Sequence, residues 1–265
     1  MVLEALISPC TLRRHPSEAI IQGAAGTAVA IFVCQILAQS GLFLTMLITL
    51  ALLPSVIIQI RHDEKQSENQ EFWKYCYEGG FLSRHGALIL DYIFLILGIS
   101  VTIACSYLII PDQTASMIYS DQVRVIGEIT GNVTRPDLFS MILVNNLGVM
   151  AICFVFSLFY ASGAIFLIAW NATVLGVVVG QGAKALAGFH AIPLVLLSYA
   201  PHGSFEFLGY ILAAIAGGIL SVAVTRHKES REHFRFILKD AVLLTVLAVA
   251  MLIIGAYIEA YPILM

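Results

Sequence analysis

Long apolar stretches alternate with short polar segments along the whole chain. Each stretch is about as long as a helix that crosses a bilayer, which needs roughly 20 residues. The pattern predicts seven membrane spans, at about residues 19–38, 41–60, 86–110, 139–160, 164–186, 203–224 and 241–261. We therefore expect a bundle of antiparallel helices in which neighbouring spans run in opposite directions.

The segments between these spans have patterns of their own. Residues 61–84 interleave charges with aromatic residues, which is typical of a helix at the level of the lipid headgroups. Residues 111–136 are polar, but their apolar positions indicate a short amphipathic helix. Residues 189–201 are apolar, short, and interrupted by Pro193 and Pro201. For them we expect a re-entrant or a surface-lying segment rather than a full crossing.

The basic residues are distributed unevenly over the two faces of this topology. With seven spans, 11 of the 14 Lys and Arg residues lie on the face that holds the N-terminus. The other face carries only Arg124, Arg135 and Lys184. Because cytoplasmic segments carry the excess of Lys and Arg, this predicts a cytoplasmic N-terminus and a C-terminus outside. An eighth crossing at residues 192–200 would remove this uneven distribution of basic residues, so we prefer seven spans.

Composition supports a membrane protein and narrows the classes of function. Hydrophobic residues make up 59% of the chain and charged residues 12%, with a mean hydropathy of +0.90, whereas a soluble domain carries about 25% charged residues. A net charge of −3 leaves no basic surface for nucleic acid, so we expect no nucleic-acid partner. The five cysteines form no CxxC or Cys/His ligand spacing. The predicted fold class is an all-α polytopic integral membrane helix bundle in the cell membrane, with the lipid bilayer as a partner.

The chain divides by polarity into three regions. Residues 1–137 form an N-terminal membrane region, 138–225 a core of three spans, and 226–265 a charged cytoplasmic loop with the final span. Small residues recur at intervals of four in the core, at Gly176 and Gly180, and again at Gly209, Ala213 and Gly217. Such GxxxG-type patterns let helix backbones approach closely, either within one chain or across a dimer.

Several polar side chains stand inside the apolar core region. They are Asn145, Asn146, Asn171, Gln181, Lys184, His202 and Glu206. A polar group in hydrocarbon costs several kcal/mol unless it is paired, so this set needs partners or a function. His202 and Glu206 are four residues apart and share a helix face. The span directions place all but Asn171 at one depth near the outer face, where we expect a single cluster. Asn171 is expected to be a separate anchor.

Three core elements and the opening of the chain carry a family resemblance. The elements are Asn145-Asn146, the run Trp-Asn-Ala-Thr-Val-Leu-Gly at 170–176, and Pro-His-Gly-x-x-Glu at 201–206; the opening is Met-Val-Leu-Glu-Ala-Leu-Ile, followed by Arg-Arg-His-Pro at 13–16. In these the chain resembles the archaeal branch of the stage II sporulation protein M family. The resemblance implies a protein of bacterial or archaeal membranes. It also implies kinship with a bacterial protein of a membrane-remodelling assembly that positions cell-wall hydrolases. The chain has Asn171-Ala172 where family members commonly have Asn-Gly.

Three interpretations of the expected cluster remain open. In the first, Asn145, Asn146, His202 and Glu206 hydrogen-bond one another and fix the fold. In the second, they form an ion or small-solute pathway, because ionisable residues inside membranes often mark one. In the third, His202 and Glu206 serve metal-assisted hydrolysis, with no evident third ligand beyond His190.

The first interpretation leads to a non-enzymatic protein. The sequence contains no HExxH or GxSxG motif and requires no cofactor. The small-residue patterns and the family resemblance both favour association. We therefore expect a membrane module that assembles protein partners or a homo-oligomer, or that organises the bilayer. An ion or solute transporter and a metal-dependent intramembrane hydrolase are the alternatives.

Overall fold

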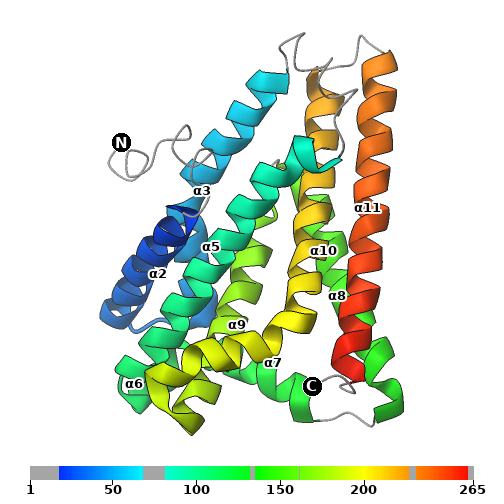
Figure 1. The fold of residues 1–265 in the computed structure, drawn as a ribbon. Helices are drawn as coiled ribbons and strands as arrows, with labels where there is room; N and C mark the ends of the chain where they lie inside the picture. Colours follow the sequence, from blue (N-terminus) through cyan, green and yellow to red (C-terminus); the bar gives the residue numbers. More distant parts are fainter. Residues whose placement is uncertain (1–17, 68–80, 132–134, 161, 227–230, 262–265) are drawn as a thin grey trace.

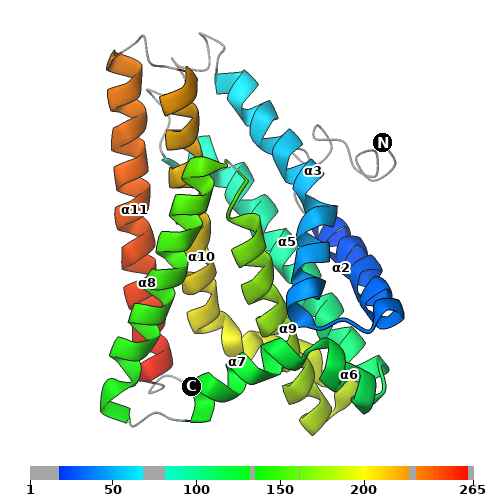
Figure 2. The same cartoon turned by 180° about the vertical axis from the view of Figure 1, so that it is seen from behind.

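The structure is a bundle of long helices that run alternately up and down (Figures 1 and 2). The computed structural model describes residues 18–67, 81–131, 135–160, 162–226 and 231–261. Its helices are α2 (Glu18–Leu37), α3 (Gly41–Ser67), α5 (Phe81–Ile109), α6 (Asp112–Ile118), α7 (Ser120–Gly131), α8 (Arg135–Phe159), α9 (Ile165–Leu186), the 3-10 turn η1 (Gly188–Ala191), α10 (Ile192–Arg226) and α11 (Arg231–Ala260). No strand occurs among these residues, as the predicted all-α class requires.

Six of the described helices are long and apolar enough to cross a membrane. Their apolar parts are Glu18–Leu37, Gly86–Ile109, Leu138–Phe159, Ile165–Leu186, Gly188–Ser221 and Ile237–Ala260. The predicted span at 41–60 corresponds to α3, whose apolar part, Gly41–Ile57, is shorter than the others. The count of helices with a long apolar part is therefore six, and α3 is a seventh helix of the bundle whose apolar part is shorter.

The start of α3 is held by the two short helices of the 111–136 segment. We name the end of the bundle where α6 and α7 lie the α6 end (Figure 1). Asp121 of α7 accepts hydrogen bonds from the Leu42 amide and the Ser40 hydroxyl, both at 3.0 Å, so it caps the free N–H groups of α3. The fully buried Gln122 donates to the Gly41 carbonyl at 3.3 Å and to the Thr173 hydroxyl at 3.1 Å. Where one short amphipathic helix is predicted, the structure has two short helices, α6 and α7.

Residues 189–201 do not form a separate crossing. They fold as η1 and the N-terminal part of α10, which lies crosswise at the α6 end before the helix turns along the bundle (Figure 1). Pro201 lies inside α10, where a proline removes a backbone hydrogen bond and bends a helix. Of the two predicted arrangements, the surface-lying segment agrees with this geometry, because the residues lie across the end of the bundle.

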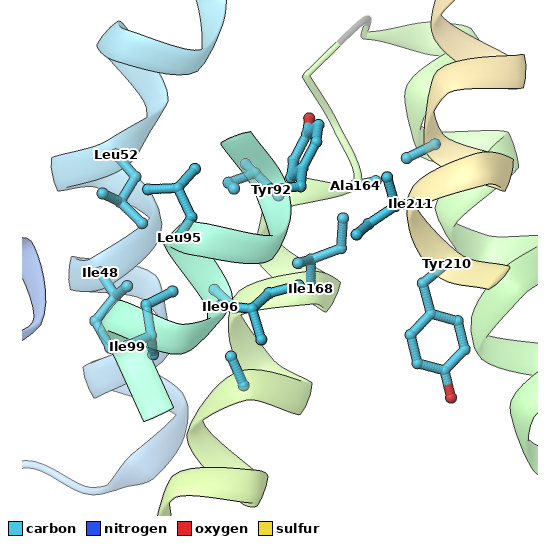
Figure 3. Packing of buried hydrophobic residues seen from close by; sticks show 14 of the residues in the cluster. Ile48, Leu52, Tyr92, Leu95, Ile96, Ile99, Ala164, Ile168, Tyr210 and Ile211 are labelled. Atoms are coloured by element: carbon cyan, nitrogen blue, oxygen red, sulfur yellow. The ribbon is translucent and has the colours of Figure 1, made fainter. Parts of the chain in front are cut away.

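The core is built where α5 packs between α2 and α9, and α3 packs against the same two helices. Ile48 and Leu52 of α3 belong to one buried cluster with Leu95 and Ile99 of α5, and all four are almost fully buried (Figure 3). α8, α10 and α11 pack mainly against one another and make a second group. The division into three sequence regions stays a prediction, but in space α9 of the core region packs chiefly against α5, and α11 against α10.

Small residues set the closest contacts between helices. A methyl group built on Gly176 would lie 2.6 Å from Ile103 Cβ, and one on Gly180 would lie 2.7 Å from Tyr107 Cβ, both on α5. Gly209 lies in the same way against Leu252 of α11. These glycines therefore serve close contacts between helices of the same chain.

Candidate functional site

A polar network joins α8 to α10 near the α6 end. The Asn146 amide donates to Glu206 Oε1 at 2.6 Å, and the Tyr210 hydroxyl donates to Asn146 Oδ1 at 2.8 Å. Asn146 and Tyr210 are buried, with 5% and 2% of their surface exposed. Glu206 and Tyr210 are four residues apart on α10, so both face the same side chain of α8. One asparagine thus ties two successive turns of α10 to α8.

α11 adds a second carboxyl group to this network. The Glu259 carboxyl lies beside that of Glu206, within hydrogen-bonding range, and interacts electrostatically with His202. This approach depends on Gly255, one turn earlier, where a methyl group would lie only 3.2 Å from Glu206 Cγ. We call Asn146, Glu206, Tyr210, Glu259 and His202 the Asn146 network.

His202 stands at the edge of this network. Its ring packs edge-on against Tyr199, with centroids 5.6 Å apart, and its Nδ1 atom is buried with no hydrogen-bond partner among the described residues. The described part of the chain contains no group of three or more His, Cys, Asp and Glu side chains that could hold a metal ion.

The remaining residues of the expected cluster lie in a second group. Gln181 donates to the Tyr107 hydroxyl at 3.4 Å, and Lys184 forms an ion pair with Asp112 of α6. The Lys184 ammonium also lies 5.9 Å from the centre of the Tyr107 ring. We call these four residues the Tyr107 group. The expectation of a single six-residue cluster is therefore corrected: Gln181 and Lys184 face α5 and α6, whereas Asn145, Asn146, His202 and Glu206 belong with α8, α10 and α11.

Asn171 makes its hydrogen bond within its own helix. Its amide donates to the Leu167 carbonyl at 2.8 Å, one turn earlier in α9. The tie between helices at this level is instead the Ser100 hydroxyl of α5, which donates to the Ala172 carbonyl at 2.9 Å. Ala172 is fully buried there, so this contact accommodates the methyl group that replaces the glycine common in the resembling family.

The sequence reasoning missed four members of these two groups, namely Glu259, Tyr210, Tyr107 and Asp112. Asp112 lies in the polar segment between two expected spans, and the two tyrosines carry no charge. Glu259 is the charged member that lies in an apolar stretch. It falls near the outer end of the last predicted span, at the depth expected for Glu206. That shared depth is the signal in the sequence that could have placed Glu259 beside Glu206.

Asn145 differs from its neighbour in where it points. It donates to Asn146 Oδ1 at 3.2 Å, yet it lies on the exposed face of α8. Its carbonyl oxygen and its second N–H have no partner among the described residues. Asn145 therefore extends the Asn146 network to the outer surface of α8.

The long apolar helices and the paired polar groups between them define a multi-pass helical membrane protein. The family model for stage II sporulation protein M matches residues 42–262, which run from the start of α3 to just beyond α11. The chain belongs to the stage II sporulation protein M family. No curated protein and no solved structure shows significant similarity to it.

Proposed function

We propose that the protein is a non-enzymatic module that assembles with other proteins in the cell membrane. The observation that supports this most directly is Asn145, a carboxamide on the exposed face of a membrane helix. Asn145 lies seven residues into the apolar part of α8, which begins at Leu138, or about 10 Å from its end at 1.5 Å per residue. At that depth lipid offers no hydrogen bond, whereas another protein can.

The remaining polar residues favour a structural role for the network behind Asn145. Asn146 is fully engaged with Glu206 and Tyr210, and Glu259 meets Glu206 from the third helix. A network of this kind holds α8 in a defined position against α10 and α11. It thereby fixes the orientation of the exposed face of α8 toward a partner.

The test is recovery of partners from native membranes. The tagged chain is purified after cross-linking in its own membranes, beside Asn145→Leu and the control Val144→Leu, which changes a neighbouring exposed residue without changing its polarity. We expect reproducible complexes with the native chain and the control, and fewer with Asn145→Leu. A strictly monomeric protein that returns no reproducible complex would end this proposal.

A second candidate function is ion or proton translocation through the Asn146 network. Two carboxyl groups that face each other between membrane helices, as Glu206 and Glu259 do, need a shared proton or a cation to be stable. Flux into liposomes that depends on an ion gradient and disappears with Glu206→Gln would support it. The matched control is Glu18→Gln, at the start of α2. No flux under any gradient would exclude it.

A further inference from the structure

We propose that the partner on the exposed face of α8 is a second copy of the same chain, so that the protein forms a two-fold dimer in which α8 packs against α8. This inference rests on the proposed function and names the occupant of the surface. Figures 1 and 2 show α8 at the edge of the bundle, beside α10 and α11.

The exposed positions of α8 follow the spacing of a helix pair. A seam of residues four and three apart runs along the middle of the exposed face, and all its members are exposed: Met141, Asn145, Gly148, Ile152, Val155 and Phe159. This alternation is that of the a and d positions in a two-stranded coiled coil. We call these six residues the α8 seam. The opposite face, with Asn146, Met150, Cys153 and Ser157, is buried in the chain.

Asn145 argues for a second copy rather than an unrelated helix. Two copies in one bilayer have the same orientation, so a two-fold axis along the membrane normal sets α8 parallel to its counterpart. Each Asn145 then meets the partner's Asn145 at the same depth. A carboxamide is both a donor and an acceptor, so the pair is self-complementary. A single asparagine in a seam of this kind fixes register and favours two parallel strands.

Gly148 provides the space for close approach. It lies one turn after Asn145, and a methyl group built on it would meet nothing within 4 Å in the chain. Unlike Gly176, Gly180 and Gly209, this glycine is not used for packing inside the bundle. A glycine on an outer surface beside an asparagine allows two backbones to come near enough for the carboxamides to meet.

The exposed face of α11 shows what a surface covered by lipid looks like in this protein. Between Val242 and Ile254, every described exposed side chain is aliphatic. That face has no polar group to satisfy, so acyl chains suffice as its surroundings. It therefore supplies a matched control for the α8 seam.

The experiment places one cysteine on each face of the full-length chain in lipid vesicles. Ile152→Cys lies in the seam and Val246→Cys on α11; both positions are 14 residues from the α6 end of their apolar stretches, Leu138 and Ala260, and both are exposed. After mild oxidation at a low ratio of protein to lipid, we expect a disulfide-linked dimer from Ile152→Cys. Val246→Cys and the native chain are expected to stay at the background level.

A second measurement does not depend on cross-linking. Energy transfer between two labelled populations of the native chain reports dimerisation, and Asn145→Leu is expected to weaken the dimer about three- to tenfold. Val242→Leu on α11 should leave the dimer unchanged.

Equal cross-linking from both faces, or energy transfer that falls to the random level on dilution, would overturn the dimer. In native membranes, cross-linking of Ile152→Cys to a different protein would also overturn it, while leaving the proposed assembly function standing. No product of either kind would remove both proposals.

Discussion

At the scale of single residues, two neighbouring asparagines have opposite surroundings. Asn146 holds Glu206 and Tyr210, and Asn145 faces outward. We predict that Asn146→Leu lowers the free energy of unfolding by roughly 1 to 3 kcal/mol, because two buried polar groups lose their partner. Asn145→Leu should leave the monomer's stability unchanged. Unfolding in mixed micelles measures both, and equal losses from the two variants would contradict the network.

A second prediction concerns Tyr119, between α6 and α7. Its hydroxyl lies 2.5 Å from Ser106 Oγ, which itself donates to the Ile103 carbonyl, so the phenol donates to the serine. Burial raises the pKa of Tyr119 to about 12, whereas an exposed phenol has a pKa of about 10. Tyr119→Phe should lower the free energy of unfolding by about 1 kcal/mol at neutral pH.

The pH dependence of that difference has a definite sign. Because the folded-state pKa of Tyr119 is raised, its stabilisation is fully present below pH 10 and is lost as the pH rises toward 12. The advantage of the native chain over Tyr119→Phe should therefore shrink by up to about 1.4 kcal/mol per pH unit in that range. Unfolding curves at several pH values test this, and a difference that is constant up to pH 12 would contradict a buried phenol.

At the scale of elements, glycines in one helix bundle differ in what surrounds them. A methyl group at Gly176 would press on Ile103 and on the Ser100 carbonyl oxygen, while one at Gly203 would meet nothing within 4 Å. We predict that Gly176→Ala destabilises the fold by roughly 1 to 3 kcal/mol through separation of α5 and α9. Gly203→Ala should be neutral or stabilising, because alanine favours a helix over glycine by up to about 1 kcal/mol. Thermal unfolding of the two variants compares them directly.

The elements themselves were largely predictable, because each is determined by a local pattern. The length of the apolar stretches indicated the long helices. The two prolines in residues 189–201 indicated that this segment would not cross the membrane by itself. The contacts that hold the start of α3 were not predictable, because Asp121 and Gln122 of α7 are far away in the sequence. Hydropathy likewise missed that α11 begins at Arg231, inside a strongly charged segment.

At the scale of the whole molecule, the candidate site was only half predictable, for a geometric reason. Counting residues from the end of a span gives the depth of a side chain but not the direction in which it points around the helix. Lys184 and Glu206 were thus correctly expected toward the same end, yet Lys184 faces Asp112 and Glu206 faces Asn146. Direction depends on which helices are neighbours, and that is decided by packing of the whole chain.

The orientation of the bundle in the membrane is the last prediction, and it follows from charge. Among the described residues, the end of the bundle opposite α6 has more basic residues: Arg61 and Lys65 at the end of α3, Arg84 at the start of α5, and Arg226, Arg231 and Arg235 where α10 ends and α11 begins. The α6 end has Arg124 in α7, Arg135 at the start of α8 and Lys184 in α9. Since an excess of basic residues stays in the cytoplasm, we expect the α6 end to face outward, and with it the Asn146 network and Asn145.

A membrane-impermeant thiol reagent, applied to intact cells that carry the chain without Cys10 and Cys76, should label Ser116→Cys on the exposed face of α6. The same reagent should label Arg235→Cys only after lysis. The reverse pattern would place Asn145 near the cytoplasmic face of the membrane. Partners would then have to be sought among proteins whose polar membrane residues lie near the inner leaflet.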